Sequence, residues 1–376
     1  MRRLGDNMTD MYIHELKDWP HFLWDHKKIS ELLIRIRHQQ GVLIGGMESI
    51  GFHTPDETLV QVLTQDVVKS SEIEGEILDQ SLVRSSVARH LGMDMAADTV
   101  DRHIDGVVEM VLDATQQFNQ PLTKERLFSW HGSLFPTGRS GFTKIKVGTW
   151  RMGPVQVVSG RLDKETLHFE TPSADRVDHE MTLFLDWFNN ESSTDLVLKA
   201  ALAHIWFITI HPFDDGNGRI GRAIVDLMLA RSEKSSHRFY SLSAQIQAER
   251  KNYYSILEKT QKGHLDVTPW IEWFFSCLER AIENALSTLN KLLSKAQFWK
   301  SLAEVPLNQR QRKIINRLLD GFEGKLTSSK WSKITKCSQD TAYRDILDLM
   351  HRGILKKNLS GGRSTSYSLV IPNHPH

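Results

Sequence analysis

Cysteine is scarce in this sequence of 376 residues, which holds only Cys277 and Cys337. Two distant thiols exclude both a disulfide framework and a CxxC metal site, and they favour a reducing compartment. Long apolar runs are lacking too, because no stretch approaches the roughly 20 residues that span a bilayer. The first residues after Met1 are polar and do not form an apolar signal region. We therefore expect a cytoplasmic protein with no membrane partner.

A net charge of one sign is also lacking, since 47 Lys and Arg face 46 Asp and Glu and leave a formal net charge of +1. The whole chain thus has no bulk attraction to nucleic acid or membrane. The distribution is uneven, however. Residues 301–376 hold 13 basic and 6 acidic side chains, a local net charge of +7, so the rest of the chain carries −6. This asymmetry predicts a separate C-terminal module.

Apolar residues at helical spacing recur along most of the chain, and their share of 40% is ample for a buried core. The expected helices cover Trp24–Ile36, Thr58–Lys69, Val100–Phe118, Lys124–Leu134, Val177–Phe188, Leu196–Ile210, Asn217–Met228, Ala248–Lys259 and Pro269–Ala296. Residues 137–172 differ, because they are rich in glycine and β-branched residues. Alternation at Val155–Val158 and again at Leu167–Phe169 predicts one short β-hairpin. The expected fold is therefore mainly α.

The segment His211-Pro-Phe-Asp-Asp-Gly-Asn-Gly-Arg-Ile-Gly-Arg222 lies between two strongly apolar helices. Pro212 stops the first helix, and glycines allow a tight turn and close approach to a ligand. The second helix begins near Asn217, and its free N–H groups form an anion site. Arg219 and Arg222 lie three residues apart on its first turns, where two guanidinium groups suit a polyphosphate. Any one of these residues could belong to an ordinary turn, but together they predict an anion-binding site.

Two further residues of this segment carry chemistry. An aspartate beside phosphates would repel them, so Asp215 is best explained as a ligand of a Mg²⁺ ion that bridges to the phosphates. His211 lies at the rim of the same loop. A neutral imidazole there is suited to take a proton from an attacking hydroxyl.

This segment resembles the signature of Fic-domain proteins, His-Pro-Phe-x-Asp/Glu-Gly-Asn-Gly-Arg-x-x-Arg, and matches it at every fixed position. The resemblance implies a helical core with a β-hairpin flap and transfer of AMP from ATP to a Ser, Thr or Tyr hydroxyl of a target protein or of the chain itself. It leaves open whether another nucleotide group is moved. Together with the charge asymmetry, it leads us to expect three regions: an N-terminal helical region at 1–100, a catalytic domain at 101–296 and the C-terminal module at 301–376.

The resemblance assigns roles to the matching positions. It makes His211 the general base and Asp215 the ligand of Mg²⁺, and it anchors the loop in the core through Phe213. The residues expected to bind ATP are Gly216, Asn217, Gly218, Arg219, Ile220, Gly221 and Arg222, with a looser assignment of nucleoside contacts to Tyr253 and Gln261. The expected flap positions the target segment by strand addition through Val155, Gln156, Val157 and Val158.

A second pattern of the family, Ser/Thr-x-x-x-Glu-Gly/Asn, is matched by Ser70, Glu74 and Gly75. In the family this pattern belongs to an inhibitory helix, expected here near residues 60–75. Its glutamate would pair with Arg222. A carboxylate on Arg222 prevents that side chain from binding the γ-phosphate and places negative charge where this phosphate belongs. The resemblance therefore implies an enzyme inhibited by its own N-terminal region.

The C-terminal module shows an amphipathic helix at Leu307–Leu319, a short helix at 327–334, a capped helix at Ser338–Met350 and two strands, Gly353–Leu355 and Tyr367–Leu369, around residues 360–363. This order resembles a winged helix with 338–350 in the recognition position. Its charge suits contact with DNA phosphates. Because Arg344 and Asp345 mix signs on that helix, protein interaction or dimerisation stays an equal alternative.

The favoured interpretation is an autoinhibited protein adenylyltransferase with ATP and a target protein as partners and Mg²⁺ as cofactor. A DNA-binding regulator whose Fic fold senses nucleotide is the alternative from another class. Removal of AMP from modified protein, with Glu74 orienting a water molecule, is a third. A homodimer is expected only from the resemblance, and the aromatic region 10–60 has no expected role beyond packing and contact with a target or partner.

Overall fold

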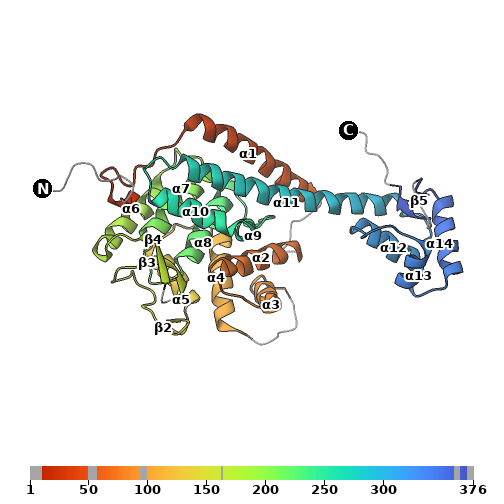
Figure 1. The fold of residues 1–376 in the computed structure, drawn as a ribbon, viewed down its shortest axis with the longest axis horizontal. Helices are drawn as coiled ribbons and strands as arrows, with labels where there is room; N and C mark the ends of the chain where they lie inside the picture. Colours follow the sequence, from red (N-terminus) through yellow and green to blue (C-terminus); the bar gives the residue numbers. More distant parts are fainter. Residues whose placement is uncertain (1–10, 50–56, 94–99, 162–163, 360–364, 371–376) are drawn as a thin grey trace. The chain divides into compact units, whose positions relative to one another are not determined.

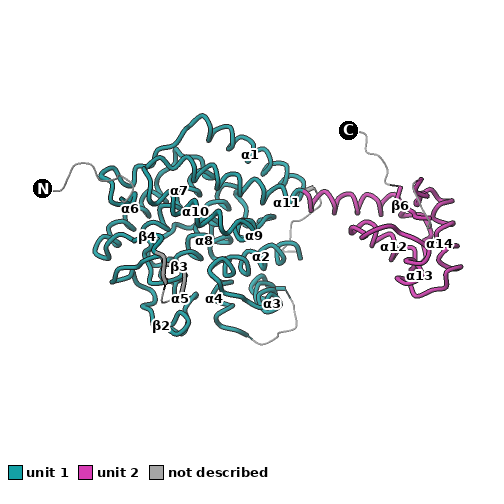
Figure 2. Tube along the Cα trace, viewed as in Figure 1, with its two compact units in different colours: residues 1–286 teal, residues 287–376 magenta. Residues whose placement is uncertain are grey.

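The computed structural model describes residues 11–49, 57–93, 100–161, 164–359 and 365–370. The chain forms two compact units, residues 1–286 and residues 287–376 (Figure 2). The boundary falls inside α11 (Thr268–Ser301), so residues 287–301 belong with the C-terminal module. The N-terminal region expected at 1–100 shares one unit with the helices that follow it. Among the described residues, no helix combines the length and apolar character needed to cross a membrane.

Unit 1 is almost entirely helical, as the periodicity predicts. Its helices are α1 (His26–Ser49), α2 (Glu57–Ile73), α3 (Gln80–His90), α4 (Arg102–Gln116), α5 (Lys124–Leu134), α6 (Val177–Asn190), α7 (Leu196–Ile210), α8 (Asn217–Glu233), α9 (Leu242–Ala248), α10 (Arg250–Gln261) and the first part of α11, with short 3₁₀ turns at Ile13–Glu15 and Ala174–Arg176. Its strands form two antiparallel hairpins, β1 (Arg139–Ser140) with β2 (Thr143–Lys144), and β3 (Gln156–Arg161) with β4 (Lys164–Glu170). The sequence did not indicate the first of these hairpins.

The pair α7 and α8 forms the centre of unit 1. In the view of Figure 1 both lie within unit 1, with α1 above them and α3 and α5 below. Every residue of α7 from Val197 to Ile210 is buried, which explains why this helix is apolar on all sides. The side chain of Asp195 caps its start by accepting the N–H of Val197 at 2.8 Å. The candidate loop is therefore a connection between two helices that the core holds firmly.

Helix α2 is attached to the start of α9 by a buried hydrogen bond of Asp66, whose carboxyl lies near the buried charges of Asp226 and Arg238. Asp66 of α2 accepts a hydrogen bond from the Ser241 hydroxyl, and Asp226 of α8 forms a buried ion pair with Arg238. Burial, reinforced by Asp226, raises the pKa of Asp66 to about 7. At the other end of α2, the carbonyl of Ile73 accepts bonds from Arg250 Nε at 2.8 Å and the Tyr254 hydroxyl at 3.1 Å. These bonds fix the end of α2 and therefore the point from which residues 74–76 begin.

The aromatic N-terminal region packs against the base of the hairpin β3–β4. The rings of Tyr12 and His14 contact Phe169 of β4 at centroid distances of 5.1 and 5.7 Å. Farther along, Trp19 packs edge-on against Trp206 of α7, and its indole N–H donates to Glu180 of α6 at 2.9 Å. This region therefore supports the hairpin and fastens it to the core.

Unit 2 contains the last part of α11, then α12 (Gln309–Leu319), α13 (Ser328–Thr335), α14 (Gln339–His351), β5 (Leu355–Lys357) and β6 (Tyr367–Leu369). The strands pair antiparallel, and Leu326 forms a bridge to Tyr367, which extends the sheet by one residue pair. The fully buried indole of Trp331 lies in its core. The first strand begins two residues later than the expected Gly353, and the turn expected at 360–363 lies outside the described residues.

Asp345 corrects the expected surface of the C-terminal module. Its carboxylate is buried and accepts from Arg310 Nε at 2.7 Å and from Asn308 Nδ2 at 2.9 Å. Arg344, in contrast, is exposed. The two residues are neighbours in sequence but point to different sides of α14, because successive helix positions are about 100° apart. The exposed side of α14 therefore does not carry the Asp345 charge.

Candidate functional site

His211 ends α7 in a left-handed backbone conformation, with φ 53°. Its Nδ1 lies 3.3 Å from the carbonyl oxygen of Ile208, and because a carbonyl only accepts, this nitrogen carries the proton. The opposite nitrogen, Nε2, then keeps its lone pair. Burial lowers the pKa of His211 to about 4. The imidazole is therefore neutral at pH 7 and equipped to accept a proton.

The loop after His211 is shaped by Phe213 and Asn217. Phe213 is fully buried and stacks on His131 at 4.3 Å between ring centroids. Asn217 binds both backbone groups of Phe213, accepting its N–H at 3.0 Å and donating to its carbonyl at 2.8 Å. The side chain of Asn217 thus closes the loop. Only the backbone N–H of Asn217 then remains to bind an anion.

Asp215 and Gly216 lead into α8. The carboxylate of Asp215 is half-buried and accepts from the Ser140 hydroxyl and from the backbone N–H of Gly216, the latter at 2.6 Å. Gly216 caps α8 at φ 80°, where a Cβ would lie 2.9 Å from the ring of Phe135. Both the backbone conformation and the space therefore require glycine. The carboxylate consequently lies immediately before a helix N-terminus.

Arg222 is hydrogen-bonded to residues at the end of α2. Its Nε donates to the Ser70 hydroxyl at 2.9 Å, Nη2 to the Ser70 carbonyl at 2.7 Å and Nη1 to Glu74 Oε1 at 2.7 Å. The side chain of Arg222 is 3% exposed and that of Glu74 is 33% exposed. The spacing of Ser70 and Glu74 thus has a physical reason, since each binds a different edge of one guanidinium group. Glu74 lies one residue beyond the end of α2.

Gly218 provides the space for Glu74. A Cβ at this position would lie 1.9 Å from Glu74 Oε1 and 2.7 Å from its Cδ. The carboxylate therefore rests directly on the backbone of the first turn of α8. A Cβ at Gly221 would instead meet Ile208, at 2.9 Å, and His204, both of α7, and Ile220 is fully buried. Gly221 thus allows α8 to pack closely against α7, while Gly218 faces the candidate anion site.

Arg219 is engaged by a residue that the sequence patterns did not indicate. Its Nη1 donates to Glu76 Oε2 at 2.8 Å, and its guanidinium lies over the ring of Phe135 at 5.2 Å from the centroid. Glu76 in turn accepts from Nε2 of His103 on α4. Both arginines of the loop thus carry a carboxylate from residues 74–76.

Arg151 is a further residue that sequence reasoning missed. It is 2% exposed, and its Nε donates to the His211 carbonyl at 2.8 Å while its backbone N–H donates to the Pro212 carbonyl at 2.8 Å. Its other nitrogens donate to the carbonyls of Gly153 and Pro172, on either side of the hairpin β3–β4. One buried guanidinium thus joins the His211 loop to the base of the hairpin. An isolated arginine in a Gly-rich stretch gave no signal of this role.

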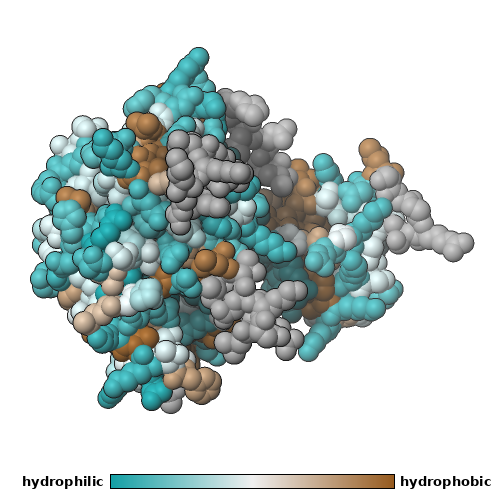
Figure 3. Space-filling view, turned by 60° about the vertical axis from the view of Figure 1, so that its left-hand side comes forward, coloured by the Kyte–Doolittle hydropathy of each residue, from teal (hydrophilic) through white to brown (hydrophobic). Residues whose placement is uncertain are grey.

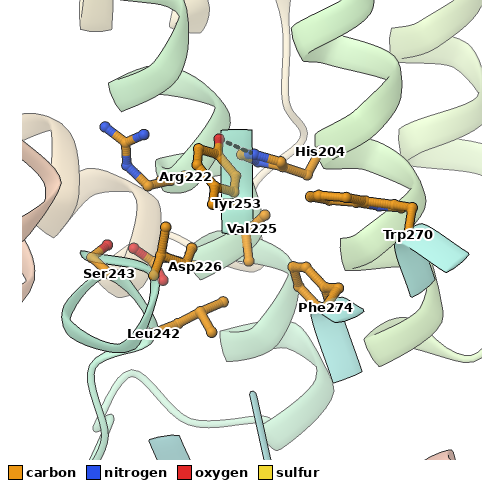
Figure 4. A pocket seen from close by; sticks show the side chains of 10 residues that line it. His204, Arg222, Val225, Asp226, Leu242, Ser243, Tyr253, Trp270 and Phe274 are labelled. Atoms are coloured by element: carbon orange, nitrogen blue, oxygen red, sulfur yellow. Dashed lines mark hydrogen bonds between the residues drawn. The ribbon is translucent and has the colours of Figure 1, made fainter. Parts of the chain in front are cut away.

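Tyr253 and Gln261, expected at the nucleoside, both lie in the core. The Tyr253 hydroxyl bonds to His204 Nε2 at 2.8 Å, and Gln261 donates to Thr209 of α7 at 3.3 Å. Figure 4 shows Tyr253 and His204 lining a small pocket near Arg222, whose guanidinium points away from Phe274. Tyr253 is 2% exposed, whereas the neighbouring Tyr254 is 38% exposed. A nucleoside contact through Tyr253 would first require its ring to be uncovered.

The hairpin expected to act as a flap forms with its register interrupted between Val157 and Val158. Gln156 pairs with Glu170 and Val157 with Phe169, while the carbonyl of Val155 accepts the Thr171 hydroxyl at 2.8 Å. Among the described residues β3 pairs only with β4, so its other edge is unpaired. Figure 3 shows a mostly hydrophilic face on which apolar residues occur in separate areas.

Family models match two parts of the chain. Residues 121–229 match the model described as "Fic/DOC family", and residues 12–93 match "Domain of unknown function (DUF4172)". The first match includes the whole segment 211–222. The chain therefore carries a Fic domain.

Two curated relatives, both named "Protein adenylyltransferase Fic", extend this similarity. The protein of Nematostella vectensis is 25% identical over 229 residues, which cover 60% of this chain and 49% of the relative. That of Drosophila willistoni is 34% identical over 105 residues, 27% of this chain and 20% of the relative. The chain thus spans about half, or less, of the length of these relatives.

Two solved structures share the fold. A Fic family protein from Desulfovibrio desulfuricans G20 has a TM-score of 0.54 at 20% identity and covers 92% of this chain and 97% of its own. A Fic domain containing signaling protein from Bacteroides thetaiotaomicron has a TM-score of 0.50 at 22% identity, with 67% of this chain and 97% of its own covered. The mainly helical Fic fold expected from the sequence is thereby confirmed.

Proposed function

We propose that this chain transfers AMP from ATP to a Ser, Thr or Tyr hydroxyl of a target protein and that its own Glu74 restrains the reaction. The observation that carries the proposal is the complete loop 211–222, with a neutral His211 at one end and Arg222 bound to Glu74 at the other. The relatives named as adenylyltransferases support the same reaction. Labelled AMP appearing on protein after incubation with ATP and Mg²⁺ tests it.

In this mechanism Nε2 of His211 takes the proton from the attacking hydroxyl, whose oxygen displaces pyrophosphate from the α-phosphorus in line. The N–H groups at the start of α8 and the guanidinium groups of Arg219 and Arg222 bind the phosphates. The protein contributes mainly by positioning and by stabilising charge. Arg151 holds the base in place, because it fixes the carbonyl of His211.

The donor set of the loop fits a Mg²⁺ ion. Mg²⁺ in phosphate-transfer sites is commonly held by one or two carboxylates together with substrate phosphates. Asp215 offers one half-buried carboxylate, fixed by Ser140 and Gly216, at the start of the helix that would bind those phosphates. We infer that Asp215 would hold the ion. When bound, Mg²⁺ neutralises charge on the phosphates and on the departing pyrophosphate.

The target would be aligned by the unpaired edge of β3. An extended segment that adds to this edge gains main-chain hydrogen bonds without a sequence requirement. Arg151 links the ends of the hairpin to the His211 backbone, so a segment bound there is held in a fixed relation to the base. Residues 155–158 thus remain the proposed target-positioning part of the site.

The pH dependence of the reaction should follow the depressed pKa of His211. With its pKa at about 4, lowered chiefly by burial, His211 stays unprotonated well below neutral pH. In a released Glu74→Gly variant, we expect the transfer rate at pH 5.5 to stay close to that at pH 7.5. A base with the ordinary pKa of about 6.5 would keep only about a tenth of its activity at pH 5.5. Initial rates at saturating ATP between pH 5 and 8 measure this.

The control for the pH series is ATP affinity, measured at each pH because ATP itself takes up a proton in this range. A tenfold fall of the rate at pH 5.5 with ATP still saturating would show that the base titrates normally. His211 would then not have the depressed pKa described above.

A second proposal concerns unit 2, for which we propose contact with DNA phosphates. The observation that favours it is the burial of Asp345, which leaves six exposed basic side chains on or next to α13, α14 and β5, with Asp340 as an exposed acidic residue of α14. The six basic residues are Lys330, Lys333, Lys336, Arg344, Lys356 and Lys357. Such a surface gives binding that weakens steeply with salt.

We expect the full chain to shift a duplex of about 30 base pairs at low salt, and we expect this binding to weaken several-fold when Lys333 and Arg344 are changed to glutamate. Each contact between a basic side chain and a phosphate that is lost also lowers the slope of log binding constant against log salt concentration by about one. Lys313→Glu, on exposed α12, is the matched control. Equal binding by all three proteins, or none at either of two salt concentrations, would leave protein interaction as the function of unit 2.

A further inference from the structure

Arg219 has its own carboxylate partner, separate from the pair Glu74–Arg222. Glu76 Oε2 accepts from Arg219 Nη1 at 2.8 Å, and the side chain of Arg219 is 7% exposed while that of Glu76 is 34% exposed. Arg219 is the first of the two arginines to which the proposed mechanism gives phosphate contacts. An anion from the protein thus lies where an anion of the substrate is expected.

The environment of Arg219 leaves room for a better partner than Glu76. Its Nε is buried and has no hydrogen-bond partner among the described residues. The opposite contact, with the ring of Phe135, is a cation–π interaction and satisfies no N–H group. Glu76 therefore occupies one edge of the guanidinium only. Nε and Nη2 form one edge of the guanidinium, and Glu76, which accepts only from Nη1, does not use it. A phosphate with three oxygens is able to bind this edge with two of them.

Glu76 is held from its other side by His103 on α4. Nε2 of His103 donates to Glu76 Oε1, and Asp101 fixes the start of α4 by accepting the backbone N–H of His103 at 2.9 Å. The hydrogen bond from His103 lowers the pKa of Glu76, and the same bond raises the pKa of His103. Glu76 is consequently an ionised carboxylate held between Arg219 and His103.

The geometry of residues 74–76 matches that of the two arginines. Gly75 adopts φ 87°, and the N–H of Glu76 returns to the carbonyl of Ser71 at 3.0 Å, so the chain reverses between the two glutamates. Arg219 and Arg222 lie three residues apart at the start of α8 and face the same side. One tight turn therefore presents one carboxylate to each arginine.

We propose that Glu76 is a second inhibitory carboxylate that keeps Arg219 from the nucleotide phosphates, and that His103 is the residue that positions it. The proposal rests on the function proposed above only in that Arg219 and Arg222 bind a polyphosphate. When only Glu74 withdraws from Arg222, the nucleotide must still displace Glu76 from Arg219. Complete release of the site requires that both carboxylates withdraw.

The test compares ATP binding and AMP transfer in wild type, Glu74→Gly, Glu76→Gln and the double variant. Glu72→Gln is the matched control, because Glu72 lies on the same helix end but pairs with Lys69 at 2.7 Å. Calorimetry with ATP and Mg²⁺ should show about tenfold tighter binding for Glu76→Gln, since a competing charge is removed from a partly buried site. The double variant should have a KM for ATP about tenfold lower than Glu74→Gly, with kcat changed less.

His103 is tested through the same quantity. His103→Ala should give part of the gain in ATP affinity in a protein that retains Glu76 and none in a Glu76→Gln background. His103→Gln, which keeps an N–H donor near the carboxylate, should restore the wild-type value. A role of His103 in packing alone would affect both backgrounds equally, and thermal melting of each variant shows whether the fold is retained.

The outcomes separate this proposal from the proposed function. If Glu74→Gly raises AMP transfer but Glu76→Gln binds ATP as Glu72→Gln does, the second carboxylate is overturned and the proposed function stands. Weaker ATP binding by a folded Glu76→Gln protein overturns it as well, because Glu76 would then assist the nucleotide. If no variant transfers AMP yet Glu76→Gln binds ATP more tightly, the proposal holds and the transfer reaction fails.

Discussion

Glu74→Gly should raise AMP transfer by this chain on the order of 100-fold. Arg222 in the folded protein donates through all three of its nitrogens to Ser70 and Glu74. Removal of the carboxylate frees Nη1 and opens the space over Gly218, so a γ-phosphate is able to take the place of Oε1. Placing one charge-stabilising group correctly is worth about 100- to 1000-fold in rate. Transfer of labelled AMP to total protein, followed over time with ATP and Mg²⁺, measures the gain and displays the target.

The control variants separate the effect of removing the Glu74 charge from the effect of removing its side-chain volume. Glu74→Gln keeps the side-chain volume but removes the charge, so it should release part of the activity, whereas Glu72→Gln should behave as wild type. Ser70→Ala removes one bond to Arg222 and should loosen the same contact. A folded Glu74→Gly protein that transfers AMP no faster than wild type would contradict inhibition by this residue. The wild type should then be tested for removal of AMP from modified protein, the remaining role considered for Glu74.

The loop 211–222 could be predicted from the residues because local rules determine it, whereas its relation to Glu74 was implied only by the resemblance to Fic-domain proteins. A proline after an apolar helix, glycines at a turn with φ 80° at Gly216, and two arginines three residues apart on a helix each have one main structural consequence. The same holds for the helices themselves, whose apolar faces repeat at helical spacing. Element types were therefore predictable, and so was the cluster that contiguous residues form.

Arg151, Glu76 and His103 could not be found in this way, because their roles depend on contacts between distant segments. Arg151 meets the His211 loop across 60 residues, and Arg219 meets Glu76 across 143. Nothing in the spacing of one charged residue tells which backbone carbonyl or which opposite charge the fold will bring to it. Glu76 in particular follows a glycine after an acidic helix end, and such residues are ordinarily solvated.

Tyr253 and Asp345 show a second limit, because helical periodicity does not tell which polar side chains of a helix face inward. Both lie on helices whose existence was evident, and both are buried through polar partners, His204 for Tyr253 and Arg310 for Asp345. A polar residue that faces inward looks like an outward one until its partner is known. Helical periodicity alone therefore does not predict which polar side chains of a helix are exposed and which are buried.

His211→Ala should remove AMP transfer almost entirely, by about 100- to 10 000-fold, when measured in the Glu74→Gly background where the activity is large. ATP affinity should change little, because His211 lies at the end of α7 and the arginines and helix N–H groups that bind phosphates lie on α8. The backbone bond from Arg151 to the His211 carbonyl does not depend on the side chain and should keep the loop in place. Calorimetry with ATP and a single-turnover assay with labelled ATP together separate binding from chemistry. Retained transfer would show that another group accepts the proton. A joint loss of ATP binding and transfer would show that the substitution at the end of α7 also disturbs the phosphate site on α8, so that the base and the phosphate site are not independent.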